Sequence, residues 1–549
     1  MKTQIIQLIL EALHNSGLYD RVEGVEKMVE LERPKESSHG HFSTNLAMQL
    51  PRFLKKSPRD IAKIIVNNLP EELEIIDKIE IKGPGFINFF LTDEALQSII
   101  NKIKDEGRNF GKNNSGEGKK AIVEFVSANP TGPLTVGHGR QAVLGDCIAR
   151  ILEWNGYDVH REYYYNDAGR QMRILGYSTY IRYRQLLGFD DELPEDYYQG
   201  QYIKDIARKI VDEFGDKYKD NKEAAIFREY AEQAVFKDIN NTLQELGIEF
   251  DQYFNEKDLY ENGKIEAVLK HFEEIGASYE KNGATWFKAS QYGVDEDRVL
   301  WKSVADEATY RLPDMAYHQT KFERGFDRIV DIFGADHHAT YPDVLAGLRA
   351  LGYDPDQVEV IIHQFVTLMQ GDQKIKMSTR KANYVTLDEL INEVGKDVVR
   401  YFFIMRKAKS QLNFDLDLAK KEGEENPVFY LQYAHARICS ILRKAKARNI
   451  DLNKDGDLAL LSEPETLDLL YILEEFRELI SLCGESLEPQ HITRYLEKLA
   501  ASFHKFYTEC RVLSDDRDLT QARLEVVKAV QRVMANGLNI IGVDAPERM

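Results

Sequence analysis

The stretch NPTGPLTVGHGR, residues 129–140, is the least regular part of an otherwise regular region. It follows the apolar run AIVEFV at 121–126 and precedes QAVLGDCIARILEW at 141–154, whose apolar residues recur at helical spacing. A glycine-rich turn between a buried strand and a helix leaves backbone N–H groups free at the helix start, where partial positive charge favours an anion such as phosphate. The sequence therefore predicts a strand–turn–helix unit whose turn suits a phosphate group.

The composition of this turn leaves two interpretations open. Gly137 and Gly139 would let a ligand approach the backbone closely, and His138 between them adds a side-chain donor. However, the stretch matches neither the P-loop pattern, because no lysine follows Gly139, nor the dinucleotide-binding fingerprint. On spacing alone, a nucleotide site and a purely structural turn are equally well supported.

The elements that follow predict a parallel sheet. DVHREYYY at 158–165 completes a strand–helix–strand unit, and further strands are expected at 327–333 and 358–368 around a helix at 339–352. Strands that alternate with helices at this spacing form parallel sheets. The expected fold for residues 120–420 is therefore an α/β nucleotide-binding parallel sheet of the Rossmann-like kind. The charged, tyrosine-rich and mostly helical stretch at about 175–300 is interpreted as an insertion in it.

Two smaller regions flank the sheet. Residues 1–110 combine helical periodicity with a strand-like run at 76–91, which predicts a small N-terminal α/β domain, and the glycine-rich stretch 107–120 is the expected linker. From residue 425 to 549 the chain shows four helical runs without strand patterns. This last region is expected to form an all-α domain.

Bulk composition narrows the class of protein. With 549 residues, 43% of them hydrophobic, the chain is long enough to bury the cores of three or four domains. No apolar run approaches the ~18 residues of a membrane span, and the N-terminal run reads as an amphipathic helix rather than a signal peptide. The four cysteines include no CxxC pair, so no disulfide framework is expected and a reducing cytoplasm is the expected location. The net charge of −19 argues against a general nucleic-acid coat but not against local basic patches.

A second irregular stretch decides between the two interpretations of the turn. GDQKIKMSTRKANYVTL, residues 371–387, is a basic loop after the last expected strand. Taken together, the two stretches resemble the signature motifs of class I aminoacyl-tRNA synthetases. TVGH at 135–138 stands where that class has H-I-G-H, and KMSTR at 376–380 stands where it has K-M-S-K-S.

The resemblance is closest to the arginyl-tRNA synthetase family and spans nearly the whole chain. The segments that carry it include SANPTGPLTVGHGR, REYYYNDAGRQM, ATYRLPDMAYH, FGADHH, KMSTRKANYVTLDEL and ANGLNIIGVDAPERM. It implies a catalytic domain at 120–420, an N-terminal domain at 1–110 that binds the tRNA elbow, and a helical anticodon-binding domain at 425–549.

The activity that the resemblance implies is that of an arginine–tRNA ligase. Such an enzyme joins L-arginine to ATP as arginyl-adenylate and then transfers arginine to the 3′ end of tRNA(Arg), in protein synthesis. ATP is expected as its Mg²⁺ complex, and no tightly bound cofactor is expected. A carboxylate that attacks the α-phosphate needs no general base, so the protein mainly positions the reactants and stabilises charge on phosphate oxygens.

By match to the two motifs, the residues expected to act on the phosphates are Thr135, Gly137, His138, Lys376, Ser378 and Lys381. Two positions depart from the family pattern, because Thr135 replaces the first histidine and Thr379 replaces the second lysine. Many arginyl enzymes with that loss carry a lysine shortly before the tetrapeptide, where this chain has Gly132. Lys381 is the residue expected to substitute for the missing cation, with Lys374 behind it.

The resemblance also implies the residues that bind arginine, namely Glu124, Asn129, Tyr310 and Asp314. Carboxylates suit a planar guanidinium because they accept two parallel hydrogen bonds, and Asn129 would contact the α-amino or carboxylate end. A buried glutamate without a cation is costly, which is the physical reason for Glu124 to select one. The alternative is that Glu124 lies on an edge strand and faces water.

The residues expected at ATP are Pro130, Gly132, Gly139, Gly334, Asp336 and Met377. Gly334 and Asp336 lie in FGADHH, which members of the family place beside the ribose and adenine. The adjacent His337 and His338 point in divergent directions, so no metal site is expected there.

The basic clusters at 51–63 and 443–448 lie in the two domains that the resemblance assigns to tRNA. Each is either a solvated helix face or an RNA contact. The chain is expected to act as a monomer and without a membrane. Two alternatives are a catalytically weakened tRNA-binding relative, favoured by the lost histidine and lysine, and a class I enzyme for another amino acid, disfavoured by the paired acidic positions.

Overall fold

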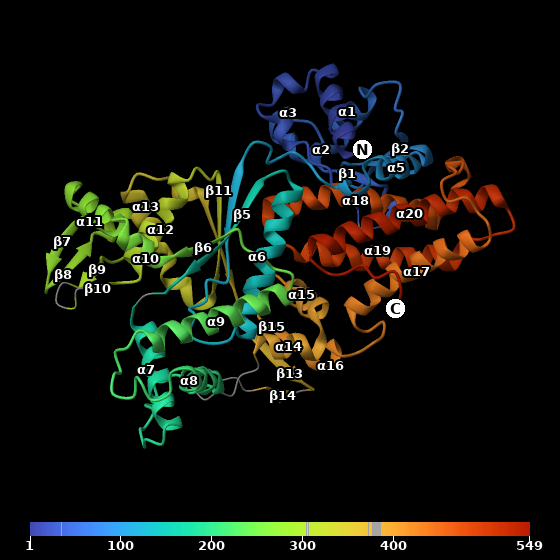
Figure 1. Ribbon diagram of the computed structural model, residues 1–549. Helices are drawn as coiled ribbons and strands as arrows, with labels where there is room; N and C mark the ends of the chain where they lie inside the picture. Colours follow the sequence, from blue (N-terminus) through green and yellow to red (C-terminus); the bar gives the residue numbers. More distant parts are fainter. Residues whose placement is uncertain (35, 168, 303–304, 306, 372, 376–385) are drawn as a thin grey trace.

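The computed structural model describes residues 1–34, 36–167, 169–302, 305, 307–371, 373–375 and 386–549. It confirms the predicted fold class: a parallel α/β core, a small N-terminal α/β domain and a helical C-terminal domain (Figure 1). No helix in the described part of the chain combines the length and the apolar character that crossing a bilayer requires.

The central sheet has five parallel strands in the spatial order β12-β11-β4-β5-β6. Their bounds are Lys120–Glu124 (β4), Asp158–Tyr165 (β5), Gln252–Asn255 (β6), Arg328–Gly334 (β11) and Val358–His363 (β12). All the strands point the same way, so the residues that follow them gather at one edge of the sheet, where α/β proteins place ligands.

The two faces of the sheet pack against different helices. Ala121 and Val123 of β4 share a hydrophobic cluster with the buried face of α6 (Val136–Trp154). Ile122 lies in a second cluster with Leu348 of α13 (Tyr341–Ala350). Successive strand residues alternate between faces, so Glu124 lies on the side of Ile122, over which α12 (Arg311–Glu323) passes. β4 is the middle strand of the sheet, so the alternative of an edge strand facing water is wrong for Glu124.

Two runs that the sequence presents as single strands are each divided. Residues 358–368 form β12 and then β13 (Val366–Gln370), which belongs to a separate sheet with β14 (Gln373–Lys374) and β15 (Leu412–Asp415). The chain bends at Gln364, whose carbonyl accepts a 2.7 Å hydrogen bond from buried Arg140. The run 76–91 is a hairpin of β2 (Ile76–Lys82) and β3 (Phe86–Leu91).

The stretch interpreted as a helical insertion is more varied than its periodicity indicates. It contains α7 (Gly169–Leu186), α8 (Gln201–Phe214), α9 (Ile226–Glu245), α10 (Glu256–Glu261) and α11 (Lys264–Glu274). It also contributes β6 to the central sheet, so part of it is integral to the core. A four-stranded antiparallel sheet follows: β7 (Ser278–Lys281), β8 (Ala284–Phe287), β9 (Arg298–Lys302) and β10 (Glu307–Ala308). These strands are too short for a period-2 pattern to stand out.

The terminal regions lie side by side on one flank of the core (Figure 1). The N-terminal domain contains α1 (Lys2–Asn15), β1 (Phe42–Thr44), α2 (Leu46–Gln49), α3 (Pro51–Leu54), α4 (Pro58–Asn67), β2, β3 and α5 (Asp93–Glu106). The C-terminal helices are α17 (Pro427–Ala447), α18 (Pro464–Ser486), α19 (Gln490–Glu509) and α20 (Arg517–Ile540), one for each predicted run. Arg33 joins the two regions through Glu474 and Glu478 of α18, at 2.5 and 3.1 Å.

A single buried side chain joins the core, the insertion and the C-terminal region. α14 (Leu387–Val394), α15 (Lys396–Ile404) and α16 (Leu416–Ala419) come after residues 376–385, and α15 carries Arg400. The Arg400 guanidinium donates to the carbonyls of Leu246 and Ile541, at 2.8 and 2.9 Å, and pairs with Asp146 of α6. A Cβ on Gly542 would lie 2.2 Å from that guanidinium, so the chain needs glycine there.

We predict that Arg400→Met lowers the free energy of unfolding by about 3–5 kcal/mol, because it leaves Asp146 charged inside the protein and two carbonyls without a donor. Chemical denaturation followed by circular dichroism measures the change. Lys498→Met is the matched control, since its ion pair with Glu475 is half exposed and is worth under about 1 kcal/mol. Equal effects of the two substitutions would contradict the assignment of Arg400 as the junction.

Candidate functional site

The turn between β4 and α6 is fixed by a reciprocal cap. The Thr135 hydroxyl accepts the His138 backbone N–H at 3.4 Å, and His138 Nδ1 accepts the Thr135 backbone N–H at 3.2 Å. Because Nδ1 is an acceptor, the ring proton lies on Nε2. Burial lowers the pKa of His138 to about 4, with Asp336 opposing the shift, so near neutral pH the ring is an uncharged Nε2–H donor.

The glycines of the turn have different surroundings. The Gly137 Cα has room for a ligand, since the nearest described atom to a Cβ there is the Thr135 hydroxyl at 3.6 Å. A Cβ on Gly139 would instead lie 2.5 Å from Leu387, and the Gly139 N–H bonds the Thr135 carbonyl. Gly139 thus allows α6 to pack closely on α14, a reason other than the ligand approach expected from the sequence.

Gly132 and its neighbour meet the insertion. The Tyr202 hydroxyl, from α8, donates to the Thr131 carbonyl at 2.5 Å and would lie 3.0 Å from a Cβ on Gly132. Pro130 lies in the same turn and is buried. The position where many relatives carry a lysine is therefore packed against a tyrosine in this chain.

The two signature stretches meet in space although they are about 240 residues apart in the sequence. The Leu387 N–H bonds the Leu134 carbonyl at 2.8 Å, and Thr135 and Thr386 form an isolated antiparallel bridge. Thr386 and Leu387, which follow residues 376–385 in the sequence, thus lie beside the start of α6. The predicted residues Lys376, Met377, Ser378 and Lys381 lie outside the described residues.

The ends of β11 and β12 contribute further residues to the region around the turn between β4 and α6. Gly334 ends β11, and a Cβ there would lie 2.5 Å from the Asp336 carboxylate. His363 at the end of β12 is buried, and burial lowers its pKa to about 4, with opposing contributions from its Gln364 carbonyl contact and from Asp336. The electrostatic influence of Asp336 on both His138 and His363 places these three groups in one region. Sequence reasoning did not identify His363.

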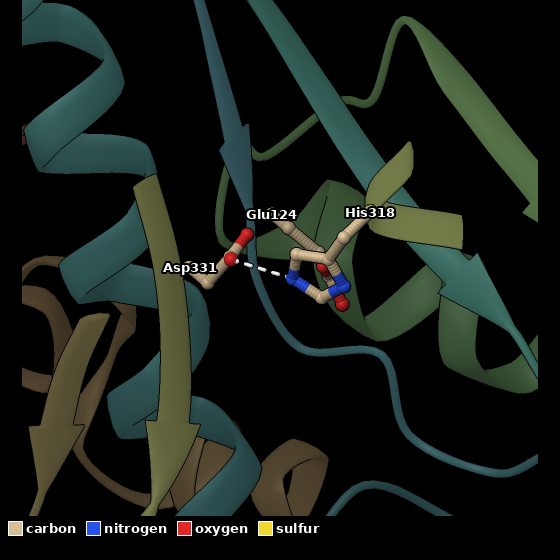
Figure 2. A group of neighbouring side chains, drawn as sticks. All are labelled: Glu124, His318 and Asp331. Atoms are coloured by element: carbon tan, nitrogen blue, oxygen red, sulfur yellow. Dashed lines mark hydrogen bonds and ion pairs between the residues drawn. The ribbon is translucent and has the colours of Figure 1, made fainter. Parts of the chain in front are cut away.

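A cluster of charged side chains lies under the carboxyl ends of β4 and β11. Glu124 and Asp331 are directly opposite each other in the parallel register and point to the same face (Figure 2). Lys321 of α12, which is 0% exposed, places Nζ 2.6 Å from Glu124 Oε2 and 2.6 Å from Asp331 Oδ1. Glu124 Oε1 accepts a hydrogen bond from Ser127 at 2.9 Å. The cation that buried Glu124 needs is thus already present within the protein.

His318 extends the cluster. Its Nδ1 lies 2.7 Å from the Asp314 carbonyl and its Nε2 lies 2.8 Å from Asp331 Oδ2, the contact drawn in Figure 2. Both ring nitrogens of His318 therefore face oxygen acceptors. Burial favours the neutral form of Asp331, but Lys321 and His318 together hold its pKa well below the usual range.

The same cluster is the one group in the described residues that brings metal-binding atoms together. One ligand atom each from Glu124, His318 and Asp331 lie within 4.8 Å of one another. The Lys321 ammonium, however, bonds both carboxylates, and both ring nitrogens of His318 already face oxygen acceptors. The geometry therefore favours an internal ion cluster over a metal centre.

Asp314 is the acid that this cluster leaves without a partner. Its carboxylate makes no hydrogen bond or ion pair within the part of the chain that the structure describes, and it lies one helical turn from Tyr310, whose side chain is 70% exposed. Burial raises the pKa of Asp314 to about 7; Glu124 and Glu256 add to the rise, while His318 and Lys321 oppose it. Near neutral pH, the carboxyl group of Asp314 is therefore present in both its neutral and its ionised form.

Asn129 lies in the turn between β4 and α6, and its side-chain amide donates a hydrogen bond to Gln171 of α7 at 2.8 Å. Between Asn129 and Glu124 the chain passes through Val126 and Ser127 with φ of +68° and +40°. Such angles are strained for a β-branched residue and mark functional sites when the surroundings enforce them. Ser127 is held there because its hydroxyl bonds Glu124 and also accepts the Tyr164 N–H at 3.1 Å.

The sequence contains a signal for three residues that were missed, His318, Lys321 and Asp331. Asp314, His318 and Lys321 are spaced by four and three residues, which places them on one face of α12. Asp331 is a carboxylate in the middle of an apolar strand. A polar stripe on an amphipathic helix and one acid in a buried strand together predict a buried ion cluster.

Comparisons with known proteins agree with this geometry. The chain matches the family model for the catalytic domain of class I (R) tRNA synthetases at 99–418, the arginyl-tRNA synthetase N-terminal domain at 3–91 and the DALR anticodon-binding domain at 431–549. It is 49% identical to an arginine–tRNA ligase of Desulfotalea psychrophila, covering 100% of this chain and 99% of that one, and 48% identical to one of Salinibacter ruber, covering 95% and 96%.

Solved structures with the same fold are also similar. A Campylobacter jejuni protein described as an arginyl-tRNA synthetase has a TM-score of 0.77 and 32% identity, covering 84% of this chain and 100% of that chain. The arginyl-tRNA synthetase of Thermus thermophilus has a TM-score of 0.78 over 100% of both chains, and at 24% identity it supports the fold alone.

We predict that Asp314→Asn stabilises the protein at pH 8. Folding raises the pKa of this carboxyl group, so ionised Asp314 costs stability as pH rises from about 4 to 7, and the full cost, up to about 4 kcal/mol, is present above pH 7. Urea denaturation from pH 4.5 to 8 should show a gain that grows with pH. Asp220→Asn, at an exposed position, should show no such trend, and a gain independent of pH would contradict the assignment.

Proposed function

This chain belongs to the arginyl-tRNA synthetase family of class I, and on that basis we propose how its residues divide the work of binding arginine, ATP and tRNA. It is an arginine–tRNA ligase, which uses ATP to join arginine to tRNA. The proposal covers the assignment of residues, the Mg²⁺ complex of ATP, the monomeric state and the cytoplasmic location.

Recognition of arginine is assigned to the acidic site under the ends of β4 and β11. The observation that supports it most is the Asp314 carboxylate, which is partly buried and has no partner among the described residues, while the acids around it have partners. A guanidinium satisfies such a carboxylate with two parallel hydrogen bonds. Tyr310 stands one turn away, and Glu124 offers the remaining lone pairs of its fixed carboxylate.

Asn129 is assigned to the α-amino or carboxylate end of arginine, because it lies beyond the strained turn from Glu124. An amide suits that end, since it offers both a donor and an acceptor. Uncharged side chains would be rejected because they would leave the Asp314 charge unpaired in the site.

MgATP is assigned to the region between the start of α6 and the end of β11. The His138 Nε2–H is a neutral donor at a helix start, a position that favours phosphate through the helix dipole. Gly137 has space for close approach, and Gly334 with Asp336 lies at the neighbouring strand end. Developing charge on the α-phosphate would be stabilised by these donors and by the lysines of 376–381.

Binding of tRNA is assigned to the terminal domains. In the 51–63 cluster, Lys55, Lys56 and Arg59 are exposed, and Arg52 lies over the ring of half-exposed Phe53 at 4.6 Å. In the 443–448 cluster Lys444 and Lys446 are exposed as well. Exposed cations with an adjacent aromatic ring suit an RNA backbone and unstacked bases.

We predict arginine-dependent exchange of labelled pyrophosphate into ATP, measured with and without cognate tRNA. Asp314→Asn should raise the KM for arginine roughly 100-fold while leaving the KM for ATP unchanged, because only the guanidinium loses a charged partner.

Exchange that occurs only with tRNA would show that tRNA binding completes the site. A protein that binds tRNA but gives no exchange in either condition would instead be the weakened relative that the two substituted signature positions suggest.

Lys381→Ala should slow adenylate formation roughly tenfold or more with little change in arginine affinity, because the lost charge would act on phosphate in the transition state. Single-turnover formation of arginyl-adenylate measures this rate. Lys222→Ala, which removes an exposed lysine between α8 and α9, is the control and should leave the rate unchanged. A wild-type rate for Lys381→Ala would remove its assignment as the substitute cation.

A further inference from the structure

Lys321 is the buried cation on which the charges of the arginine site depend. It lies on α12, its side chain is 0% exposed, and among the described residues its ammonium contacts Glu124, Asp331 and the face of Tyr317, 4.4 Å from the ring centroid. A lysine rarely lies fully inside a protein unless it is paired. Its desolvation is costly, and this cost has to be offset by the two carboxylates.

Without that ammonium, the two strands would place like charges beside each other. Glu124 and Asp331 are register partners on adjacent parallel strands and share a face, so their carboxylates face a common space. Two ionised carboxylates that share a buried space repel each other unless a cation lies between them. Burial would lower the pKa of Lys321, but Asp331 and Glu124 together raise it, so the ammonium stays charged between the two acids.

The ion pairs in the cluster show which carboxylate is left to bind the guanidinium of arginine. Lys321 forms ion pairs with both Glu124 and Asp331, and His318 adds a contact to Asp331 at 2.8 Å. On the neighbouring strand, Glu162 is paired with Arg324 by two hydrogen bonds of 2.5 and 2.8 Å. Asp314 and Glu256 have no ion pair among the described residues, but the Glu256 carboxylate accepts the Tyr164 hydroxyl, so Asp314 is the acid left there without a polar partner.

We propose that Lys321 is a positioning residue for arginine selection: its ammonium fixes Glu124 as an ionised, oriented acceptor and leaves Asp314 as the carboxylate whose charge the substrate guanidinium neutralises. The inference rests on the proposed function, because it concerns how the arginine site discriminates. Glu124 then supplies geometry, and Asp314 supplies the net charge that attracts arginine. Lys321 acts through Glu124 and contacts no substrate itself.

The groups that face Asp314 give the proposal a measurable sign. Glu124 of β4, Glu256 of α10 and Tyr164 of β5 face it from other elements, and His318 and Lys321 face it from α12 itself. Arginine binds the ionised carboxylate, so arginine affinity should rise with pH through the pKa of Asp314, which is about 7. The pH midpoint of arginine binding therefore moves upward when a positively charged neighbour of Asp314 is removed. It moves downward when a negatively charged neighbour is removed.

The test is the pH profile of arginine binding, measured by isothermal titration calorimetry with L-arginine on the full chain, together with KM and kcat in pyrophosphate exchange. Lys321→Met should raise the KM for arginine roughly tenfold or more at pH 7.5, leave the KM for ATP unchanged and move the midpoint upward by about one pH unit. Glu124→Gln should move the midpoint downward, because Asp314 loses a negative neighbour that is ionised only if Lys321 maintains its charge.

Arg324→Met is the matched control for damage to the fold. Arg324 lies at the same end of α12 as Lys321, and the substitution breaks its ion pair with the fully buried Glu162 of β5. It should lower stability without moving the midpoint by a comparable amount. If Lys321→Met fails to fold, Glu124→Gln still decides the question, because an unmoved midpoint would mean that Glu124 is not an ionised neighbour of Asp314.

Three outcomes separate the proposal from its premise. A midpoint that moves up in Lys321→Met and down in Glu124→Gln supports the positioning role. A Lys321→Met enzyme with wild-type KM for arginine and an unmoved midpoint overturns it, because Lys321 would then be structural only. A wild-type protein whose exchange does not depend on arginine would reject the proposed function itself, whatever the variants show.

Discussion

The parallel register between β4 and β11 imposes the main constraint on this molecule. It places Glu124 opposite Asp331, and two carboxylates in a dry interior cannot both remain charged without a cation between them. Lys321 satisfies that constraint from α12, which fixes how the helix lies across the sheet, and the same helix carries Asp314 and His318. One electrostatic requirement thus links the position of α12 to the composition of the proposed arginine site.

The rest of the site is built outward from that cluster by the backbone. The strained turn at Val126 and Ser127 redirects the chain directly after Glu124, and the Ser127 hydroxyl restrains the carboxylate from the other side. The chain then runs through the cap of Thr135 and His138 into α6, and that cap also joins the signature loop through Leu387. The amino-acid end and the phosphate end of the reaction are therefore connected by one short, restrained segment.

The sequence predicts the parts of this arrangement that depend on local pattern. The alternation of strands and helices, the four C-terminal helices and the turn at 129–140 follow from periodicity and turn chemistry, and the fold class agrees with them. It does not predict that Glu124 would find an internal partner, because Lys321 lies 197 residues away and only the sheet register brings them together. For the same reason β6 and the bend at Gln364 were missed, since both depend on tertiary pairing rather than on the residues nearby.

The contact between Tyr202 and the turn limits how this enzyme can change. Its hydroxyl is bonded to Thr131 and would stand 3.0 Å from any Cβ at position 132, where many relatives carry a lysine. A single exchange of Gly132 for lysine would have to displace that tyrosine and its hydrogen bond, which makes the first step unfavourable on its own. Positions 132 and 202 belong to different segments, so placing a lysine at position 132 requires two coordinated changes. The cation missing at Thr379 is therefore difficult to replace from position 132, and a compensating charge is expected elsewhere.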